Sequence, residues 1–166
     1  MDSIIKYTKV REVKSPTRAT AVAAGIDFYI PEDFRTLTLF PQCDVLIPSG
    51  IKARIPKGHM LYITNKSGVA SSNEAKSRAG LKASKVDGIL IKGADTIDQD
   101  YQGEIHLHLI NLGRESIKLE PGMKIAQGVI IPVNYALPVE VESTEKLFKD
   151  IESARGNNGF GSTSNT

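Results

Sequence analysis

The sequence contains little of what several classes of protein depend on. Cys43 is the only cysteine among 166 residues, which excludes an intrachain disulfide framework and a cysteine-rich zinc module. The three histidines are scattered along the chain, which argues against a histidine metal cage. No apolar run approaches the about 20 residues that a membrane-spanning helix needs. We therefore expect a protein that does not contact membranes and does not depend on a resident transition metal.

Charge of one sign is also scarce. Lysine and arginine number 21 and aspartate and glutamate 19, so the formal net charge is only +2. This balance gives no bulk attraction to nucleic acid, and we expect no stable nucleic-acid complex. Any anion that the chain binds must be held locally. The expected location is the cytoplasm.

Short apolar runs separated by turn residues are abundant. Fourteen glycines and eight prolines divide the chain about every ten residues, which is typical of many short strands. Segments 51–55 and 105–109 alternate apolar and polar residues, so each predicts a strand with one buried face. Further strands are predicted at 45–47, 60–64, 117–119 and 125–133. The pattern predicts one all-β domain, a sandwich or a barrel.

Three segments interrupt this β pattern. Ser71 and Glu74 have the spacing of a capping box, so residues 73–79 form either a short helix or a mobile loop. Ser143 or Thr144 is expected to cap a second helix, with an apolar side formed by residues 147, 148 and 151. Residues 155–166 are too polar and too rich in glycine to pack a core, which predicts a tail or a lid.

Three clusters have residue types suited to chemistry on a nucleotide. Residues 97–104 place Asp98 and Tyr101 at a strand junction, where they form either an ordinary turn or a water-activating site beside an aromatic platform. Residues 65–68 place Lys66 and a hydroxyl at a strand end, which suits phosphate but is also common in loops. Phe160 lies between two glycines and can cover a nucleobase or dock on its own subunit.

Taken together and in order, these segments resemble the five motifs of the trimeric deoxyuridine triphosphatase (dUTPase) family. The resemblance covers almost the whole chain. The matching segments are AGIDFY at 24–29, KSGVA at 66–70, IDQDYQGE at 97–104, PGMKIAQ at 121–127 and RGNNGFGST at 155–163.

This resemblance implies a reaction and a role for each matching residue. The reaction is the Mg²⁺-dependent hydrolysis of dUTP to dUMP and pyrophosphate, which supplies dUMP for thymidylate synthesis and keeps uracil out of DNA. By resemblance, Asp98 is the catalytic carboxylate that activates water, and Asp27 lies near water molecules of a Mg²⁺ ion that is held mainly by substrate phosphates. The residues that would bind the substrate are Lys66, Ser67, Gly68, Thr96, Ile97, Tyr101, Gln127, Arg155, Phe160, Gly161 and Ser162.

The resemblance also implies an architecture. The expected fold is a jelly-roll-like distorted barrel of the β-clip type with one or two short helices, assembled as a homotrimer. Residues 1–154 would form the β domain, with an insertion at about 71–85, and residues 155–166 a flexible tail that closes over a site of the trimer. Two departures stand out: Lys66 occupies a position where arginine is usual, and Asp95 one where glycine is usual.

Two other functions remain compatible with the sequence. One is a dCTP deaminase-like enzyme, which shares the fold. The other is a nucleotide-sensing protein with a regulatory protein partner. In that case the insertion, which contains Lys76, Arg78, Lys82 and Lys85 against Glu74, would present a basic surface to the partner.

Overall fold

The computed structural model describes residues 4–83, 87, 88, 90–154, 156 and 157. The chain divides into two units, Met1–Asn134 and Tyr135–Thr166. The predicted division after residue 154 stays a prediction. Among the described residues, none of the helices has the length and the apolar composition needed to cross a bilayer.

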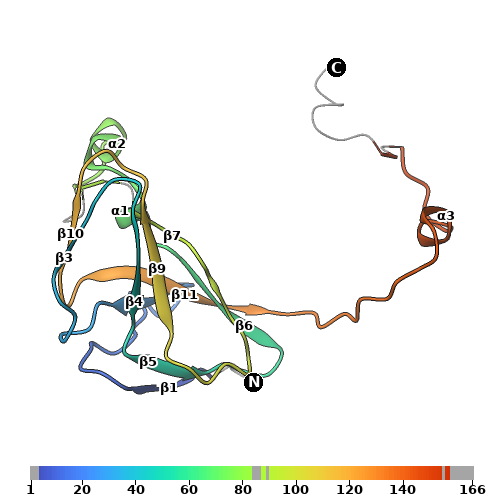
Figure 1. Cartoon of the computed structure of the whole chain (residues 1–166), viewed down its shortest axis with the longest axis horizontal. Helices are drawn as coiled ribbons and strands as arrows, with labels where there is room; N and C mark the ends of the chain where they lie inside the picture. Colours follow the sequence, from blue (N-terminus) through green and yellow to red (C-terminus); the bar gives the residue numbers. More distant parts are fainter. Residues whose placement is uncertain (1–3, 84–86, 89, 155, 158–166) are drawn as a thin grey trace. The chain divides into compact units, whose positions relative to one another are not determined.

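The described part of the first unit is built from short strands that pair in antiparallel fashion (Figure 1). They form four sheets with the orders β1-β5, β10-β3, β2-β11-β6-β8 and β4-β9-β7. The strands are β1 Lys6–Lys9, β2 Ile26–Tyr29, β3 Leu37–Leu39, β4 Asp44–Pro48, β5 Ile51–Arg54, β6 His59–Asn65, β7 Leu90–Lys92, β8 Thr96–Ile97, β9 His106–Asn111, β10 Ile117–Leu119 and β11 Lys124–Pro132. The all-β prediction is confirmed.

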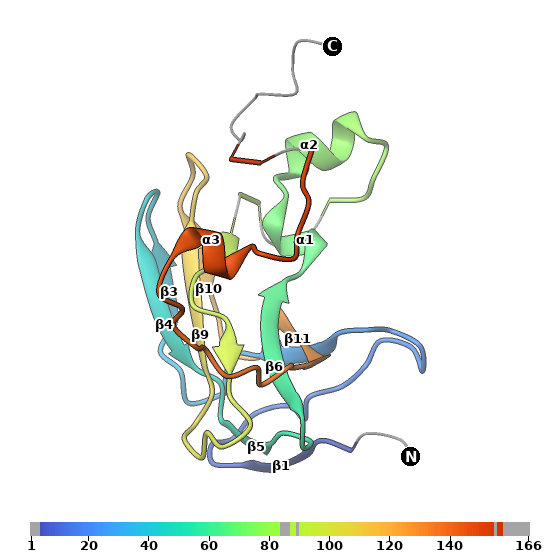
Figure 2. The same cartoon turned by 90° about the vertical axis from the view of Figure 1, so that its right-hand side faces the viewer.

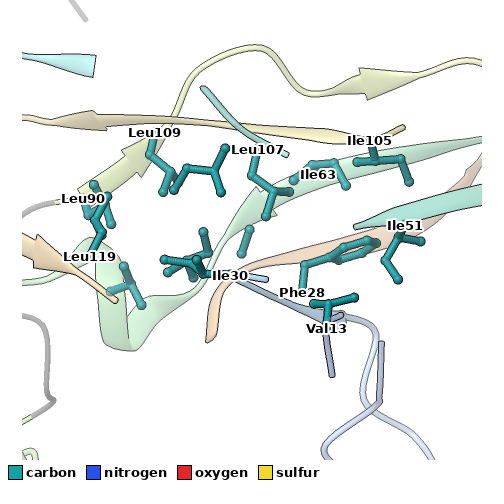
Figure 3. Close-up of a cluster of buried hydrophobic side chains, with 14 of the residues drawn as sticks. Val13, Phe28, Ile30, Ile51, Ile63, Leu90, Ile105, Leu107, Leu109 and Leu119 are labelled. Carbon is teal, nitrogen blue, oxygen red and sulfur yellow. The ribbon is translucent and has the colours of Figure 1, made fainter. Parts of the chain in front are cut away.

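All four sheets contribute to one hydrophobic core. Figure 3 shows Phe28 from β2, Ile63 from β6, Leu107 and Leu109 from β9, and Leu119 from β10 turned toward a shared interior. Leu107 and Leu119 are fully buried, and Leu109 is 1% exposed. In β9 the buried leucines alternate with two partly exposed histidines, as the sequence pattern predicts. Apolar side chains from all four sheets therefore pack together in one core cluster.

Strand β6 connects the two ends of this unit. Figure 2 shows it rising from the end that contains β1 and β5 to the helix α1, Ser67–Ala70. β11 pairs with β6 on one side along seven residue pairs, from Ala126 opposite Asn65 to Pro132 opposite His59. β8 pairs on the other side, where Ile97 lies opposite Leu61. Groups placed at the two ends of β6 are consequently far apart.

The segment expected to be a helix or a mobile loop forms a helix. α2 spans Asn73–Arg78, and Ser72 caps it because its hydroxyl oxygen accepts a hydrogen bond from the Ala75 N–H at 3.2 Å. The expected cap at Ser71 is wrong, since that residue ends α1 in an extended conformation. The expected surface role of Lys76 is wrong as well: it is 5% exposed and faces the interior.

The second unit contains one short helix, α3, Thr144–Leu147, within its described residues. Ser143 caps it by accepting from the Lys146 N–H at 3.3 Å. The expected apolar side is not packed: the helix ends after one turn, and residues 147, 148 and 151 are each more than half exposed. The apolar side chains of this segment therefore stabilise nothing within the described chain.

Candidate functional site

Three neighbouring strands bring the first, second and fourth motifs together. Gln127 on β11 lies opposite Asp27 on β2 and opposite Thr64 on β6. Lys66 follows β6 directly and precedes α1, which begins at Ser67. The sequence places these residues up to a hundred positions apart, and the β2-β11-β6 pairing makes them neighbours.

Asp27 is the centre of this group and carries two ion pairs. Its carboxylate is buried, with one oxygen 2.5 Å from Lys66 Nζ and the other 2.8 Å from Lys124 Nζ. Burial by itself would raise the pKa of Asp27, but hydrogen bonds and charge interactions with Lys124 and Lys66 outweigh it and lower the pKa below its ordinary value. The same hydrogen bond raises the pKa of Lys124. Two ammonium groups against one carboxylate leave this cluster with a net positive charge.

Gln127 is held close to the cluster by packing as well as by a hydrogen bond. Its side-chain amide donates to the Asn65 carbonyl oxygen at 2.9 Å. A Cβ atom at Gly25 would overlap the amide oxygen of Gln127, so the first motif has glycine where the fourth motif packs against it. The Asn65 side chain in turn accepts from the Lys92 N–H at 2.7 Å and ties β6 to β7.

A cavity of about 920 Å³ opens beside these residues. Lys66 and Lys124 line it together with Lys14, whose Nζ lies 5.8 Å from the centre of the Tyr29 ring. Lys124 Nζ lies 5.9 Å from the same ring. Four lysines line the cavity against the three carboxylates of Glu32, Asp87 and Glu120, and the excess of positive charge suits an anion. We name this region, Asp27, Lys66, Ser67, Gly68, Lys124 and Gln127, the cationic cluster.

The third motif forms a second, separate pocket. Asp98 directly follows β8, and the Tyr101 N–H donates to the Asp98 carbonyl oxygen at 3.2 Å, which closes a turn. The Tyr101 hydroxyl donates to the Glu104 carbonyl oxygen at 2.9 Å, and the ring lies over Gly103, where a Cβ would overlap it. Both Asp98 and Tyr101 are exposed. An exposed carboxylate beside an aromatic ring can act on a water molecule next to a stacked sugar or base.

A small cavity of about 230 Å³ lies against this turn. We name it the third-motif pocket. It is lined by Leu46, Ala94, Asp95, Thr96, Ile97, Asp98, Tyr101, His106 and His108.

His108 organises one wall of the third-motif pocket. Its Nδ1 accepts a hydrogen bond from the Ala94 N–H at 3.1 Å, so the proton of the neutral ring lies on Nε2, which is 2.8 Å from an Asp44 carboxylate oxygen. Gly93 leaves room for the ring, because a Cβ there would overlap it. Lys92 donates from Nζ to the carbonyl oxygens of Gly93 and Ala94, and burial lowers its pKa. Sequence reasoning missed both His108 and Lys92, since neither belongs to a matching segment.

Asp98 and Lys66 lie near opposite ends of β6, although the pocket wall at Asp95 reaches Ile63, whose N–H donates to the Asp95 carbonyl oxygen at 2.8 Å. Asp98 is level with Met60, one residue beyond the Leu61–Ile97 pair, and Lys66 follows the other end of the strand. Six residues of extended chain separate the two levels by about 20 Å. Of the predicted site residues, the structure thus brings together one set around Asp27 and a second set around Asp98, but not the two sets. Arg155, Phe160, Gly161 and Ser162 lie outside the described residues.

No described part of the chain offers an obvious metal cage. Among the described residues, no three His, Cys, Asp or Glu side chains gather closely enough to hold a metal ion. Asp27, the predicted neighbour of Mg²⁺, has both carboxylate oxygens bound to lysines. A hard cation that needs several oxygen ligands fits this region only if an anionic ligand supplies most of them.

Comparisons with known proteins give one consistent result. A family model described as dUTPase matches residues 11–164. The deoxyuridine 5'-triphosphate nucleotidohydrolase of Brucella melitensis biotype 2 is 36% identical over 162 residues, covering 96% of this chain and 90% of the relative. The enzyme of the same name from Clostridium novyi is 40% identical over 148 residues, with 89% of each chain covered.

Solved structures show the same fold. A mutant dUTPase of Staphylococcus bacteriophage 80alpha with dUpNHpp superposes with a TM-score of 0.74 at 22% identity, covering 96% of this chain and 98% of that one. A mutant dUTPase from phage phi11 of S. aureus gives a TM-score of 0.66 at 22% identity, covering 86% and 99%. That structure is described as revealing the coordination of a structural Mg(II) ion.

Proposed function

Since this chain belongs to the dUTPase family, we propose that it is a dUTP diphosphatase, which hydrolyses dUTP to dUMP and pyrophosphate. The observation that carries the proposal is the pairing of Asp98 and Tyr101 at the rim of the third-motif pocket. The pocket is small, which suits a pyrimidine, and the carboxylate is exposed to water. Curated relatives with the same activity in their names support it over most of the chain.

The proposed reaction is a displacement at the α-phosphorus. Asp98 accepts a proton from a water molecule, whose oxygen forms a bond to the α-phosphorus. The bond from the α-phosphorus to the oxygen bridging to the β-phosphate breaks, and pyrophosphate leaves with that electron pair. Tyr101 packs against the deoxyribose, while Thr96 and Ile97 form the wall of the base pocket. A correctly placed carboxylate base contributes about a hundredfold or more to such a rate.

The cationic cluster is proposed to hold the triphosphate. Lys66 and Lys124 supply positive charge, and Ser67, Gly68 and Gln127 supply hydroxyl, backbone and amide donors. Mg²⁺, bound mainly by phosphate oxygens, would neutralise charge that develops on the leaving pyrophosphate. Arg155, Phe160, Gly161 and Ser162 of the tail would close over the bound nucleotide. The expected place of action is the cytoplasm, where the dUTP pool is consumed.

The separation of the two sets of residues supports a site shared between chains. A base must lie within hydrogen-bond reach of the water that it activates, and the phosphates are bonded to the atom that this water attacks. About 20 Å along β6 is too far for one chain to satisfy both requirements. We therefore propose a homotrimer in which the cationic cluster of one copy and the third-motif pocket of another meet on one dUTP molecule.

The second unit supports the same assembly. Tyr135, Leu137, Val139 and Val141 alternate with smaller or polar residues, and all four are exposed, Leu137 to 86%. In an extended segment such residues share one face. Exposed apolar faces of this kind pack on other chains. A second copy is the occupant that a homotrimer provides.

A substrate panel with two point variants tests the proposed activity. Pyrophosphate release is measured with dUTP, dCTP, dTTP and UTP, and ammonia release with dCTP. We expect hydrolysis of dUTP alone and no deamination. Asp98→Asn should reduce the rate at least about a hundredfold without unfolding the protein, because the amide cannot accept the proton. Asp100→Asn, two residues away and also exposed, is the matched control and should keep the parent rate.

Ammonia release from dCTP would contradict the proposal in favour of the deaminase. If Asp98→Asn hydrolyses dUTP at the parent rate, Asp98 is not the base. Absence of any turnover together with tight dUTP binding would favour the nucleotide-sensing function, with a partner protein on the insertion.

A further inference from the structure

Lys76 is the only side chain of α2 that is buried. Helices on a domain surface are normally held by a stripe of apolar residues, and α2, with the sequence NEAKSR, has none. Its outer face carries the ion pair between Arg78 and Glu74, both more than 70% exposed. The buried side chain through which α2 contacts the rest of the first unit is therefore a lysine.

The ammonium group of Lys76 lies against the second motif. Its Nζ donates to the Gly68 carbonyl oxygen at 2.9 Å and lies 3.4 Å from the Asn73 side-chain oxygen. Gly68 belongs to α1, a helix of only four residues, whose carbonyl groups have too few N–H donors within the helix. Lys76 thus supplies a charged donor to a carbonyl group of this short helix.

This contact continues to Lys66 through one peptide group. The carbonyl of the Gly68–Val69 peptide accepts from Lys76, and the N–H of the same peptide donates to the Lys66 carbonyl oxygen at 2.9 Å. That peptide links the Lys76 contact to the Lys66 carbonyl oxygen, which also accepts from the Ala70 N–H at 2.9 Å. A charged donor at one end also polarises the hydrogen bond at the other.

The backbone around Lys76 is fixed at both ends of α2. Asn73 donates its N–H to an Asp87 carboxylate oxygen at 2.9 Å, which anchors the first turn. The Lys76 carbonyl oxygen accepts from the Leu81 N–H at 2.8 Å beyond Gly80, whose φ of 68° allows the chain to reverse. These contacts fix the backbone from which the Lys76 side chain extends.

We propose that Lys76 is a positioning residue for the phosphate-binding turn, and that helix α2 supports this turn through it. The inference rests on the proposed function, because it assumes that Lys66, Ser67 and Gly68 hold phosphates. Lys76 acts through the Gly68–Val69 peptide and does not touch the substrate. Its loss should weaken binding of the phosphate chain and leave binding of the base and sugar unchanged.

The test compares Lys76→Met with Lys82→Met in the full-length protein. Both changes remove one positive charge from the same segment, but Lys82 is exposed. Calorimetry measures binding of pyrophosphate with Mg²⁺ and of deoxyuridine separately, and kinetics gives KM and kcat for dUTP. For Lys76→Met we expect about tenfold weaker pyrophosphate binding and a similar rise in KM, as for loss of one hydrogen bond to a charged group. Deoxyuridine binding and the Lys82→Met protein should match the parent.

The proposal would be overturned if Lys76→Met bound pyrophosphate and deoxyuridine equally more weakly, or if neither affinity changed. An equally large loss of pyrophosphate affinity in Lys82→Met would overturn it as well. If Lys76→Met does not fold, Lys76→Gln replaces it, because glutamine keeps an N–H donor without the charge. For that variant we expect pyrophosphate binding to weaken less than tenfold and deoxyuridine binding to stay unchanged. A non-selective defect in that variant would also contradict the role. Because pyrophosphate binding is measured without turnover, a parent protein that fails to hydrolyse dUTP refutes the proposed function independently of Lys76.

Discussion

Asp27 is a buried carboxylate that is stable in its charged form only because two lysines meet it. Burying a charge without a partner is unfavourable by several kcal/mol, and the ion pairs with Lys66 and Lys124 offset this. These lysines come from the second and fourth motifs, so one carboxylate orients both. Lysine in place of the arginine usual at position 66 keeps the charge but forms a single contact with one oxygen.

The lowered pKa of Asp27 gives a prediction for stability in acid. A carboxyl group whose pKa is lower in the folded state stabilises that state above its unfolded pKa, about 3.9, and the stabilisation is lost as the pH falls through the folded value. We expect the free energy of unfolding, measured with urea, to fall below about pH 4. Asp27→Asn should be less stable at pH 7 and should lack this part of the pH dependence.

The exposed Asp100→Asn serves as the control for that experiment and should follow the parent curve. The free energy of unfolding could instead change with pH in parallel for the parent and Asp27→Asn between pH 3 and pH 7. That result would show that the ion pairs contribute nothing to folding.

At the scale of elements, the β2-β11-β6 pairing assembles the cationic cluster. The alternation of side chains in each strand places Asp27 and Gln127 on the same side, since they are direct partners in the ladder. Gly25, just before β2, leaves the space that the Gln127 side chain occupies. The first motif therefore contributes the Asp27 carboxylate and also, because Gly25 has no side chain, the space for Gln127.

Gly25→Ala should separate function from stability. The added Cβ overlaps the far end of a flexible side chain, and Gly25 has no positive φ, so the backbone can accept the change. Gln127 must then leave its hydrogen bond to Asn65. We expect unfolding free energies within about 1 kcal/mol of the parent, together with a KM for dUTP raised about fivefold to tenfold. Parent-like kinetics would show that the position of Gln127 is unimportant for binding.

At the scale of the whole molecule, the distance between the two sets of site residues determines what one chain can do. Asp98 and Lys66 are at opposite ends of β6. In the proposed trimer, a single copy therefore holds two half-sites that serve different substrate molecules. Closed rotational symmetry lets every copy contribute each half once. An isolated copy should bind nucleotide poorly and turn over nothing.

Mixing two inactive variants tests this arrangement. Asp98→Asn lacks the base, and Lys66→Gln lacks a phosphate contact. Refolded together in equal amounts, they should regain about a quarter of the parent activity, because in random trimers about one site in four combines both intact halves. Light scattering should give the trimer mass for each variant. A mixture that stays inactive although mixed trimers form would place the whole site within one chain.

Local sequence pattern alone was sufficient to predict the fold class of this protein. Alternation in residues 51–55 and 105–109 and the turn residues between runs predicted an all-β domain, because a strand with one buried face shows its period directly in the sequence. The resemblance of five segments to the dUTPase motifs identified Asp98, Tyr101, Lys66, Ser67, Gly68 and Gln127 as candidates. Short helices were less predictable: the polar sequence of 73–78 was compatible with helix or loop, and the Ser72 cap with the Asp87 contact decided for helix.

Only the tertiary structure decided which of those residues meet. No local signal shows that Lys124 reaches Asp27, that His108 binds the Ala94 N–H, or that Lys76 is buried, because each depends on pairing between segments distant in the chain. Lysine is nearly always expected at the surface, and its burial requires a specific acceptor such as the Gly68 carbonyl. The separation of Asp98 from Lys66 likewise follows from the register of β6 with β8, which residue composition does not specify.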